Sequence, residues 1–276
     1  MSSLNAQVAL PRLERVGSVT QARVLGSEWT KLHSLRSTRW SLLAATVLGV
    51  GLPLLFAAVT SSHWGSMSAH ERADRHPLDI ALAGVNVAQL AIAVLGVLVI
   101  TGEYSTGMIR ATFTAVPRRL PVLWAKIVVY AAVSFALGLP AVLIAFFASQ
   151  AILSRHELLQ ISFSDPGVAR SVIGGAVYLT LIGTFALAIG AIVRNTAGGI
   201  ATFAALFFVI PPLMNVLPAS WNHAISPYLP DAAGRSIFSL THDTNSLAPW
   251  PGFLLFLGYT AAAVTTAAAL LVRRDT

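Results

Sequence analysis

The feature that most limits the fold of this chain is a series of long apolar runs. A helix of about 20 apolar residues spans the hydrocarbon layer of a bilayer. Six stretches reach or approach that length, at residues 40–60, 79–101, 120–153, 169–193, 200–217 and 251–272. Only 11% of the residues are charged, against roughly 25% in an ordinary soluble domain. We therefore predict an all-α, polytopic membrane protein with six transmembrane helices.

The gaps between these runs are too short to hold a soluble domain, since the longest has about 30 residues. The sequence thus predicts one transmembrane domain over residues 20–276, preceded by a disordered cytoplasmic tail at residues 1–19. The run at 120–153 is long for one span, but two spans would need about 40 residues and a turn. A single long helix is expected there, with Gly138 and Pro140 as a place where it can bend.

Arginine and lysine lie mostly on one side of the predicted membrane. Cytoplasmic loops carry the excess of these residues in membrane proteins. One side holds Arg12, Arg15, Arg23, Lys31, Arg36, Arg39, Arg110, Arg118, Arg119, Arg194, Arg273 and Arg274, and the other holds Arg72, Arg75, Arg155, Arg170 and Arg235. The richer side is expected in the cytoplasm. Because six spans return the chain to its starting side, the N and C termini are both predicted to be cytoplasmic.

Few side chains in the chain suit catalysis or metal binding. There is no cysteine, and three of the seven histidines share one external loop at spacings unlike those of a metal site. The sequence lacks HExxH, a Ser/His/Asp group and the phosphate-binding pattern GxxxxGK[ST]. We expect no metal, no cofactor and no enzymatic activity in this chain. Its basic residues lie at span edges rather than in a stripe with aromatics, so nucleic acid is not an expected partner.

Residues 21–34 have the pattern of an amphipathic helix just before the first span. Trp29 and Leu32 share an apolar face at helical spacing, and Lys31 lies off that face. Such a helix is expected in the membrane interface, or else packed on its own protein. Glu28 falls at the edge of the apolar face, where a carboxylate needs a partner. That partner is either Lys31, three residues on, or an arginine of a cytoplasmic loop or of another protein.

Polar and helix-breaking residues within the spans mark positions that should avoid lipid. Asn86 and Gln89 are three residues apart and share a face of the second span, which predicts contact with another helix or with a substrate. Pro211 and Pro212 remove two backbone donors from the fifth span, so its helix is expected to end or kink there. The freed carbonyls should be buried in protein or line a wet cavity. With Asn215, these residues are the candidate lining of the bundle or of a transport path.

The most informative cytoplasmic segment lies at residues 102–119, between the second and third spans. Gly107 interrupts it, and Met108, Ile109 and Phe113 form a small apolar patch. A short interfacial helix with such a patch suits docking into a groove on a partner protein. The alternative is an ordinary loop whose arginines set the membrane topology.

Two stretches of the chain are distinctive, SEWTKLHSLRSTRWSLLAATVL at residues 27–48 and GEYSTGMIRATFTAVPRRLPVLWAKIVV at residues 102–129. The first is similar to a SEWTKLRSLRST-like approach to the first span in permease subunits of ABC-2 type exporters, particularly short actinobacterial ones. The second resembles that family's GEYxxGTIRxTLxAxPRR-like loop, which is followed by a lysine. Met108 stands where the family usually has a threonine. The likeness extends as a six-span pattern over residues 20–276.

The resemblance implies roles for particular residues. The N-terminal amphipathic helix would be a connecting helix, with Glu28, Trp29, Lys31 and Leu32 in it. Residues 104–116 would form a coupling helix that contacts a separate ATPase, and residues 218–249 would hold short external helices that dip into the membrane. The residues that would couple the chain to the ATPase are Glu103, Tyr104, Gly107, Met108, Ile109, Arg110, Phe113, Pro117, Arg118 and Arg119.

The resemblance also implies partners and a function. A cytoplasmic ABC ATPase would bind ATP and Mg²⁺, and a second permease protomer, identical or different, would complete the translocation path in a bacterial plasma membrane. The expected function is therefore that of the transmembrane permease subunit of an ATP-driven exporter. An apolar path suits drugs, peptides and lipids alike. The alternative is a membrane-embedded enzyme or scaffold without transport activity.

Overall fold

The computed structural model describes residues 20–34, 36–73, 75–109, 119–154, 160–240 and 246–274, and the regular secondary structure in these ranges is helical. The predicted tail at residues 1–19 lies outside them. The long helices are α1 (Gln21–Ser34), α2 (Arg36–His63), α4 (Pro77–Ser105), α6 (Arg119–Leu153), α7 (Val168–Val193) and α12 (Pro249–Arg274). The shorter elements are η1 (Trp64–Ser66), α3 (Ala69–Ala73), α8 (Thr196–Ala204), η3 (Ala205–Val209), α9 (Ile210–Met214), α10 (Ala219–Ile225), η4 (Ser226–Tyr228) and α11 (Pro230–Arg235).

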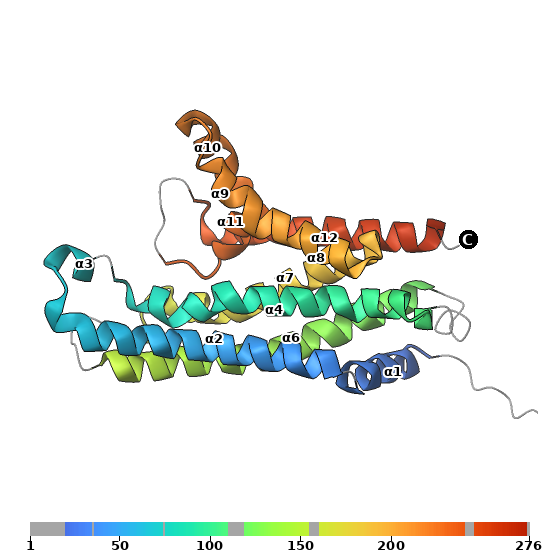
Figure 1. The fold of residues 1–276 in the computed structure, drawn as a ribbon, viewed down its shortest axis with the longest axis horizontal. Coiled ribbons are helices and arrows are strands. Elements are labelled where there is room, and N and C mark those ends of the chain that lie inside the picture. Colours follow the sequence, from blue (N-terminus) through green and yellow to red (C-terminus); the bar gives the residue numbers. More distant parts are fainter. Residues whose placement is uncertain are drawn as a thin grey trace, which may run out of the picture.

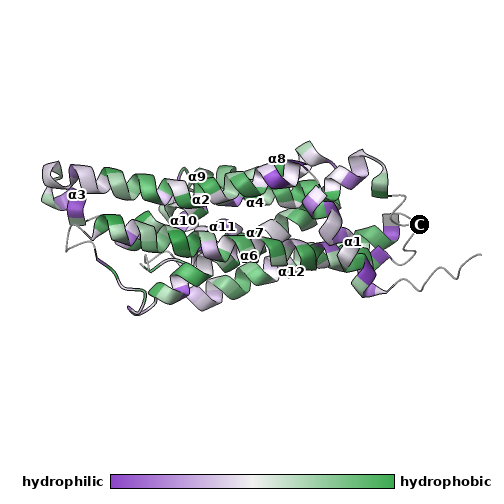
Figure 2. Cartoon of the chain, turned by 90° about the horizontal axis from the view of Figure 1, so that it is seen from below, coloured by the Kyte–Doolittle hydropathy of each residue, from purple (hydrophilic) through white to green (hydrophobic). Residues whose placement is uncertain are grey.

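Helices α2, α4, α6 and α7 run side by side along the long axis and form the body of the molecule (Figure 1). Helices α12 and α8 pack on α7, while α9 and α10 lean away from the body (Figure 1). Helix α1 and the C-terminal end of α12 lie at the same end of the bundle. An apolar band covers the middle of the long helices, between polar residues at the two ends (Figure 2). This arrangement is the one expected of helices that cross a bilayer.

Within the described ranges, six helical segments are long and apolar enough to cross a membrane, which confirms the predicted number. They cover Arg36–Ser66, Pro77–Ser105, Arg119–Leu153, Val168–Val193, Thr196–Met214 and Pro249–Arg273. The long apolar run at 120–153 forms one helix, α6, as its length predicts, and Pro140 lies inside it.

Helices α4 and α7 pack closely because glycines face the contact. A Cβ at Gly96 of α4 would overlap the backbone oxygen of Gly183 in α7, and a Cβ at Gly183 would overlap the hydroxyl of Tyr130. Tyr130 comes from α6 and donates a hydrogen bond of 2.7 Å to the backbone oxygen of Ile92 in α4. Small residues let helix backbones approach in this way in membranes, where packing replaces the hydrophobic effect as the driving force.

The fifth span changes its helical form just before the two prolines. Residues Ala205–Val209 form a π-turn, in which the N–H of Ile210 donates to the backbone oxygen of Ala205. The helix then passes through Pro211 and Pro212 and ends at Met214. Because prolines cannot supply the next two donors, the wider turn before them takes up the break in the hydrogen-bond ladder. The prediction that the helix ends here is correct to within two residues.

The segment after the fifth span folds back onto the bundle. In α11, the chain comes so close to α7 that a Cβ at Gly234 would lie 2.6 Å from the ring of Tyr178. Phe238 also packs on that ring, with the two ring centroids 5.1 Å apart. Arg170 anchors the same stretch, since its guanidinium donates to the backbone oxygens of Ile237 and Ser239 at 2.6 and 3.0 Å.

The glycine-mediated contact between α4 and α7 generates a prediction. Gly183→Ala should lower the thermal unfolding midpoint of the purified protein in detergent, because its methyl group would meet Tyr130 and Ile92, and overpacking of this kind costs about 1–3 kcal/mol. Gly138→Ala in α6 is the matched control, since a Cβ there has no neighbour within 4 Å. Equal midpoints for the two variants would contradict the packing described here.

Candidate functional site

Four charged side chains from three helices meet at the end of the bundle that carries α1. Glu28 and Lys31 come from α1, Glu103 from the last turns of α4, and Lys126 from the third turn of α6. The Nζ atom of Lys126 lies 2.6 Å from Glu28 Oε2 and 2.7 Å from Glu103 Oε1. The Nζ atom of Lys31 lies 2.7 Å from Glu28 Oε1 and 2.9 Å from Glu103 Oε1. We call these four residues the ion-pair cluster.

The ion-pair cluster is buried, and its charges balance. Glu28 and Lys126 are each 3% exposed and Glu103 is 6% exposed. Burying an isolated charge away from water is very unfavourable, so such groups are retained only where opposite charges and hydrogen bonds compensate them. Two carboxylates facing two ammonium groups meet that requirement. The cluster therefore holds α1 and the adjoining ends of α4 and α6 in one arrangement.

Lys31 is the most accessible member, with its side chain 26% exposed. Partial burial lowers the pKa of Lys31, but hydrogen bonds and charge attraction from Glu28 and Glu103 outweigh that effect and leave the pKa raised. A raised pKa in the folded protein means that the contribution of Lys31 to stability is present at neutral pH. That contribution is lost only as the pH rises through the raised pKa.

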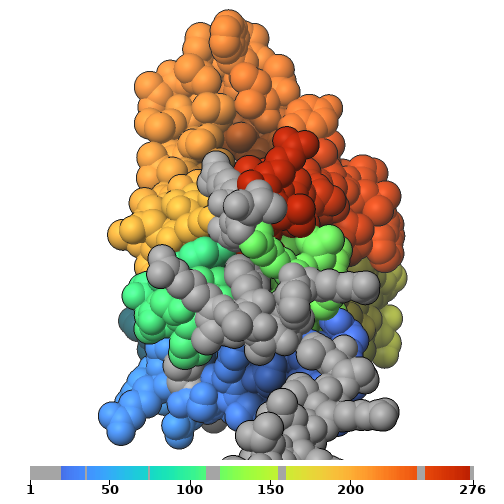
Figure 3. All heavy atoms as spheres, turned by 90° about the vertical axis from the view of Figure 1, so that its right-hand side faces the viewer, coloured from blue at the N-terminus to red at the C-terminus, as the bar shows by residue number. Residues whose placement is uncertain are grey.

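A cavity of about 280 Å³ opens beside the ion-pair cluster. We call it the amphipathic cavity, because its lining combines the cluster with apolar and hydroxyl side chains. The lining residues are Glu28, Lys31, Leu32, Ser34, Ser37, Leu98, Val99, Gly102, Glu103, Ser105, Thr106, Met108, Lys126 and Val129. Figure 3 looks onto this end of the molecule, where α1 (blue) and the ends of α4 and α6 (green) lie in the lower part, and the segment from α8 to α10 (gold to orange) and α12 (red) lie in the upper part.

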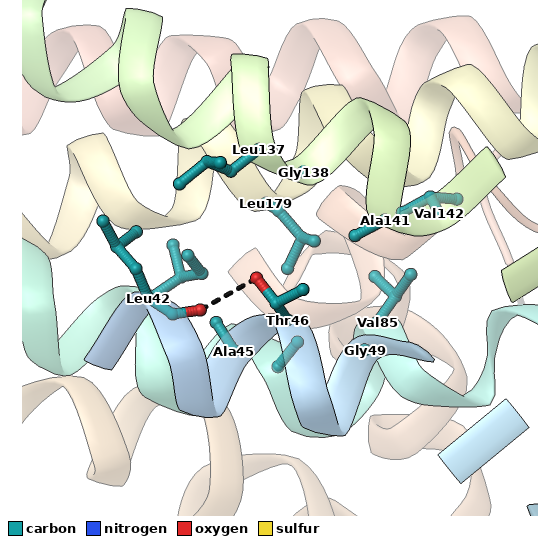
Figure 4. Close-up of a pocket in the computed structure, with 12 residues that line it drawn as sticks. Leu42, Ala45, Thr46, Gly49, Val85, Leu137, Gly138, Ala141, Val142 and Leu179 are labelled. Atoms are coloured by element: carbon teal, nitrogen blue, oxygen red, sulfur yellow. Dashed lines mark hydrogen bonds between the residues drawn. The ribbon is translucent and has the colours of Figure 1, made fainter. Parts of the chain in front are cut away.

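A second gap lies deeper, between α2, α4, α6 and α7 (Figure 4). It has a volume of about 20 Å³ and an almost wholly apolar lining. Its one hydroxyl, that of Thr46, already donates to the backbone oxygen of Leu42 at 2.9 Å. Since a buried water needs two to four polar partners, this gap is a packing defect and offers no binding site for a polar ligand.

The structure places the predicted coupling residues in different environments. Gly107 has φ of +72°, in the left-handed region that favours glycine, and it ends α4. Met108 is 44% exposed, whereas Ile109 is 8% exposed and belongs to the interior. Predicted residues Arg110, Phe113, Pro117 and Arg118 lie outside the described residues.

Two further predicted coupling residues contact other helices at the same end of the bundle. The Tyr104 ring lies under the guanidinium of Arg194, at 5.2 Å from the ring centroid. The guanidinium of Arg119 donates to the backbone oxygen of Leu271 near the end of α12, at 3.3 Å. Both contacts tie the adjoining ends of α4 and α6 to the C-terminal half of the chain.

The residues predicted to line the bundle also lie in different environments. Gln89 is fully buried and its side-chain oxygen accepts a hydrogen bond from the hydroxyl of Tyr178 in α7, which is the helix–helix contact expected of its face. Asn86 is half-buried and lines a separate cavity near α11. In the single chain, Pro211 is half-buried, whereas Pro212 and Asn215 are exposed, so their place in a protein contact or a path stays a prediction.

The environment of α1 differs from the one its sequence pattern indicated. Val24, Glu28 and Leu32 form its buried face, packed mainly against α6, and Trp29 is 50% exposed. The partner predicted for Glu28 from local spacing, Lys31, is confirmed, but Lys126 was missed. The position of Lys126 within an apolar span could have indicated this contact, because a lysine at that depth requires a counter-charge.

The fold and this site define an α-helical, multi-pass membrane protein with a buried ion-pair cluster at one end. No protein-family model matches the sequence, and no curated protein matches it. The function proposed below therefore rests on the residues of the chain itself.

Charge balance within the ion-pair cluster leads to a second prediction. Lys126→Met should lower the unfolding midpoint strongly, because removing one partner of a buried pair typically costs about 3–5 kcal/mol. Lys31→Met should have a smaller effect, since its side chain is partly exposed to water. The double variant Glu28→Gln/Lys126→Met should recover part of the loss by restoring charge balance. A wild-type midpoint for Lys126→Met would show that the cluster does not stabilise the fold.

Proposed function

We propose that this chain is the transmembrane permease subunit of an ATP-driven ABC-2 type exporter. The observation that carries the proposal is that the four residues of the ion-pair cluster come from the two stretches that resemble this family. Glu28 and Lys31 belong to the first stretch that resembles this family, and Glu103 and Lys126 belong to the second. The two stretches are far apart in the sequence, yet their charged residues form one buried unit. Because each buried charge needs an opposite charge nearby, the cluster explains why both stretches carry these residues.

The same unit suggests how force would enter the membrane helices. In the proposed complex, a cytoplasmic ABC ATPase binds ATP and Mg²⁺ and pushes on the segment between α4 and α6. Glu103 lies in the last turn of α4, just before that segment, and pairs with both lysines. Displacement of the segment would therefore move α1 and α6 together with α4. Coupled rigid-body motion of this kind switches a path between inward and outward exposure.

A second permease protomer would complete the path. The second half of the fifth span leans away from the bundle (Figure 1), and Val209, Leu213 and Val216 are between 50% and 82% exposed there. A kinked helix with a π-turn is poorly suited to face lipid alone, because its backbone groups are incompletely paired. We assign this face to the contact with the second protomer, either a second copy or a related chain.

The proposed orientation places the end with α1, Glu103 and the C terminus in the cytoplasm of a bacterial cell, with α3 and α10 outside. Because the chain has no cysteine, single cysteines can be introduced without background. A cysteine at Ser68 should react with a membrane-impermeant maleimide added to intact cells, and one at Thr106 should react only after the membrane is opened. Labelling of a cysteine at Thr106 from outside the cell would show that the proposed orientation is wrong.

Association with the ATPase provides the direct test of function. Phe113→Asp and Met108→Asp should each remove most of the ATPase that co-purifies with this chain from membranes, because truncating an apolar anchor costs about 2 kcal/mol or more and a buried charge adds to that. The ATPase to use is one encoded by a neighbouring gene. Expression level and the gel-filtration profile of the permease show whether each variant still inserts and folds.

Ile225→Asp in α10 is the matched control, since it places the same charge on an exposed apolar residue away from this end of the molecule. It should leave recovery of the ATPase unchanged. Undiminished ATPase recovery by both Phe113→Asp and Met108→Asp would remove the segment from the interface. A membrane-embedded enzyme or scaffold would then become the better explanation of the chain.

A further inference from the structure

A cavity of about 210 Å³ lies between α4 and α11, at the end of the bundle that carries α3 (Figure 1). We call it the α4–α11 cavity. One wall is a face of α4, and the other is formed by the last residue of α11 and the stretch that follows it. The lining residues are Asp79, Leu82, Asn86, Arg235, Phe238 and Ser239. None of them takes part in the coupling or the dimer contact proposed above.

The wall on α4 is a stripe of three residues. Asp79 lies in the first turn of the helix, and Leu82 and Asn86 follow at steps of three and four, which place all three on one face. Asn86 is about 10 Å farther along the helix axis than Asp79, at 1.5 Å per residue. Asp79 is exposed, whereas Asn86 is half-buried. The cavity thus has a carboxylate at its mouth and an amide in its depth.

The opposite wall is held in place by contacts outside the cavity. Arg170 donates to the backbone oxygens of Ile237 and Ser239 at 2.6 and 3.0 Å, and the ring of Phe238 packs on that of Tyr178. A wall that is already ordered lowers the cost of binding, because fewer groups lose freedom when a ligand arrives. The cavity is therefore preformed, as sites for small molecules usually are.

Two opposite charges face the cavity without pairing with each other. The carboxylate of Asp79 makes no hydrogen bond or ion pair within the described parts of the chain. Arg235 pairs with Asp231 of its own helix, from Nε to Oδ1 at 2.8 Å. That contact uses one of the five N–H donors of a guanidinium, and 39% of the Arg235 side chain remains exposed. One wall therefore offers an acceptor for a cation, and the other offers donors for an anion.

The amide of Asn86 indicates which end of a ligand lies deeper. Its Oδ1 is enclosed by protein, so the cavity can contact this amide only through its nitrogen, Nδ2. An N–H donor together with the guanidinium of Arg235 favours an anionic group in the depth, and Asp79 favours a cation at the mouth. A metal ion is a poorer match than an ammonium group, since the described residues contain no group of three His, Asp or Glu that could hold one.

We propose that the α4–α11 cavity binds a small soluble zwitterion, such as an amino acid. The carboxylate of the ligand accepts from Asn86 and Arg235, and its ammonium group donates to Asp79. Leu82 and Phe238 supply apolar contacts to the carbon chain between the two charges.

A phospholipid with an ethanolamine head carries the same pair of charges, but its acyl chains are attached on the side of the phosphate. With the phosphate in the depth of the cavity, those chains would have to enter the bundle, so a soluble molecule is the better occupant. Binding at this cavity does not depend on transport or on the ATPase. Its failure would therefore leave the proposed function standing.

The test uses three amino acids with terminal charges at increasing separation, namely glycine, γ-aminobutyrate and ε-aminocaproate. The unfolding midpoint of the full-length protein in detergent is measured against the concentration of each. A ligand that binds the folded state raises the midpoint, and at least one of the three should do so at millimolar concentration. An equimolar mixture of the alkylamine and the carboxylic acid of matching length carries the same charges without the link. It should need about a tenfold higher concentration, as the loss of one charge-assisted hydrogen bond predicts.

Two variants locate the binding at this cavity. Asp79→Asn removes a carboxylate that has no partner, so the protein should fold normally and bind the amino acid about tenfold more weakly. Asn86→Leu replaces an amide whose buried oxygen is unpaired by an apolar group of similar size, a change close to neutral for stability, and should also weaken binding. Glu71→Gln is the matched control, since it neutralises an exposed carboxylate at the same end outside the lining. It should keep wild-type binding.

Three results would overturn the proposal. If no amino acid raises the midpoint, or the unlinked mixture is equally effective, the cavity does not select a zwitterion. Wild-type binding by either cavity variant would place the amino acid elsewhere. Finally, the measurement is repeated in phosphatidylcholine nanodiscs with and without phosphatidylethanolamine. Loss of the effect of the amino acid when the ethanolamine lipid is present would assign the cavity to a lipid head group.

Discussion

Charges buried beside an apolar bilayer must neutralise one another, and this constraint organises one end of the molecule. Lys126 lies within a membrane-spanning helix and would be very unfavourable alone. Glu28 and Glu103 lie within 2.7 Å of its ammonium group, and Lys31 balances the second negative charge. Because each carboxylate contacts both lysines, no single helix can move away without leaving an unpaired charge. The position of α1 against the bundle follows from this requirement.

The rest of the bundle depends on close packing rather than on charge. In the fourth candidate span 72% of the central residues are buried, against 17% in the first and in the fifth. Helix α7 is therefore the centre of the single chain, and glycines on it and on α4 allow the close contact. The outer helices expose apolar side chains that suit lipid or another protomer. The proposed dimer contact is formed by the fifth span, where the π-turn and the prolines interrupt the backbone hydrogen bonds of the helix.

The proposed coupling passes through one residue, Glu103. Its Oε1 accepts hydrogen bonds from the lysines of α1 and α6, so the ends of three helices meet at a single carboxylate. Since a ligand or partner shifts a conformational equilibrium only by its difference in affinity for two states, an ATPase that favours another position of α4 would have to move α1 and α6 with it or break these pairs.

The sequence alone determined the six candidate membrane spans, because a run of apolar residues of bilayer length has few alternatives. It also determined local features, such as the contact of Gln89 with another helix. Local spacing predicted Lys31 as a partner of Glu28, but only the tertiary structure decided the second partner, Lys126. The helical pattern of α1 put Trp29 on the apolar face and Glu28 at the edge, yet Glu28 is buried and Trp29 is exposed. The reason is Lys126, which is 98 residues away in the sequence and makes burial of the carboxylate favourable.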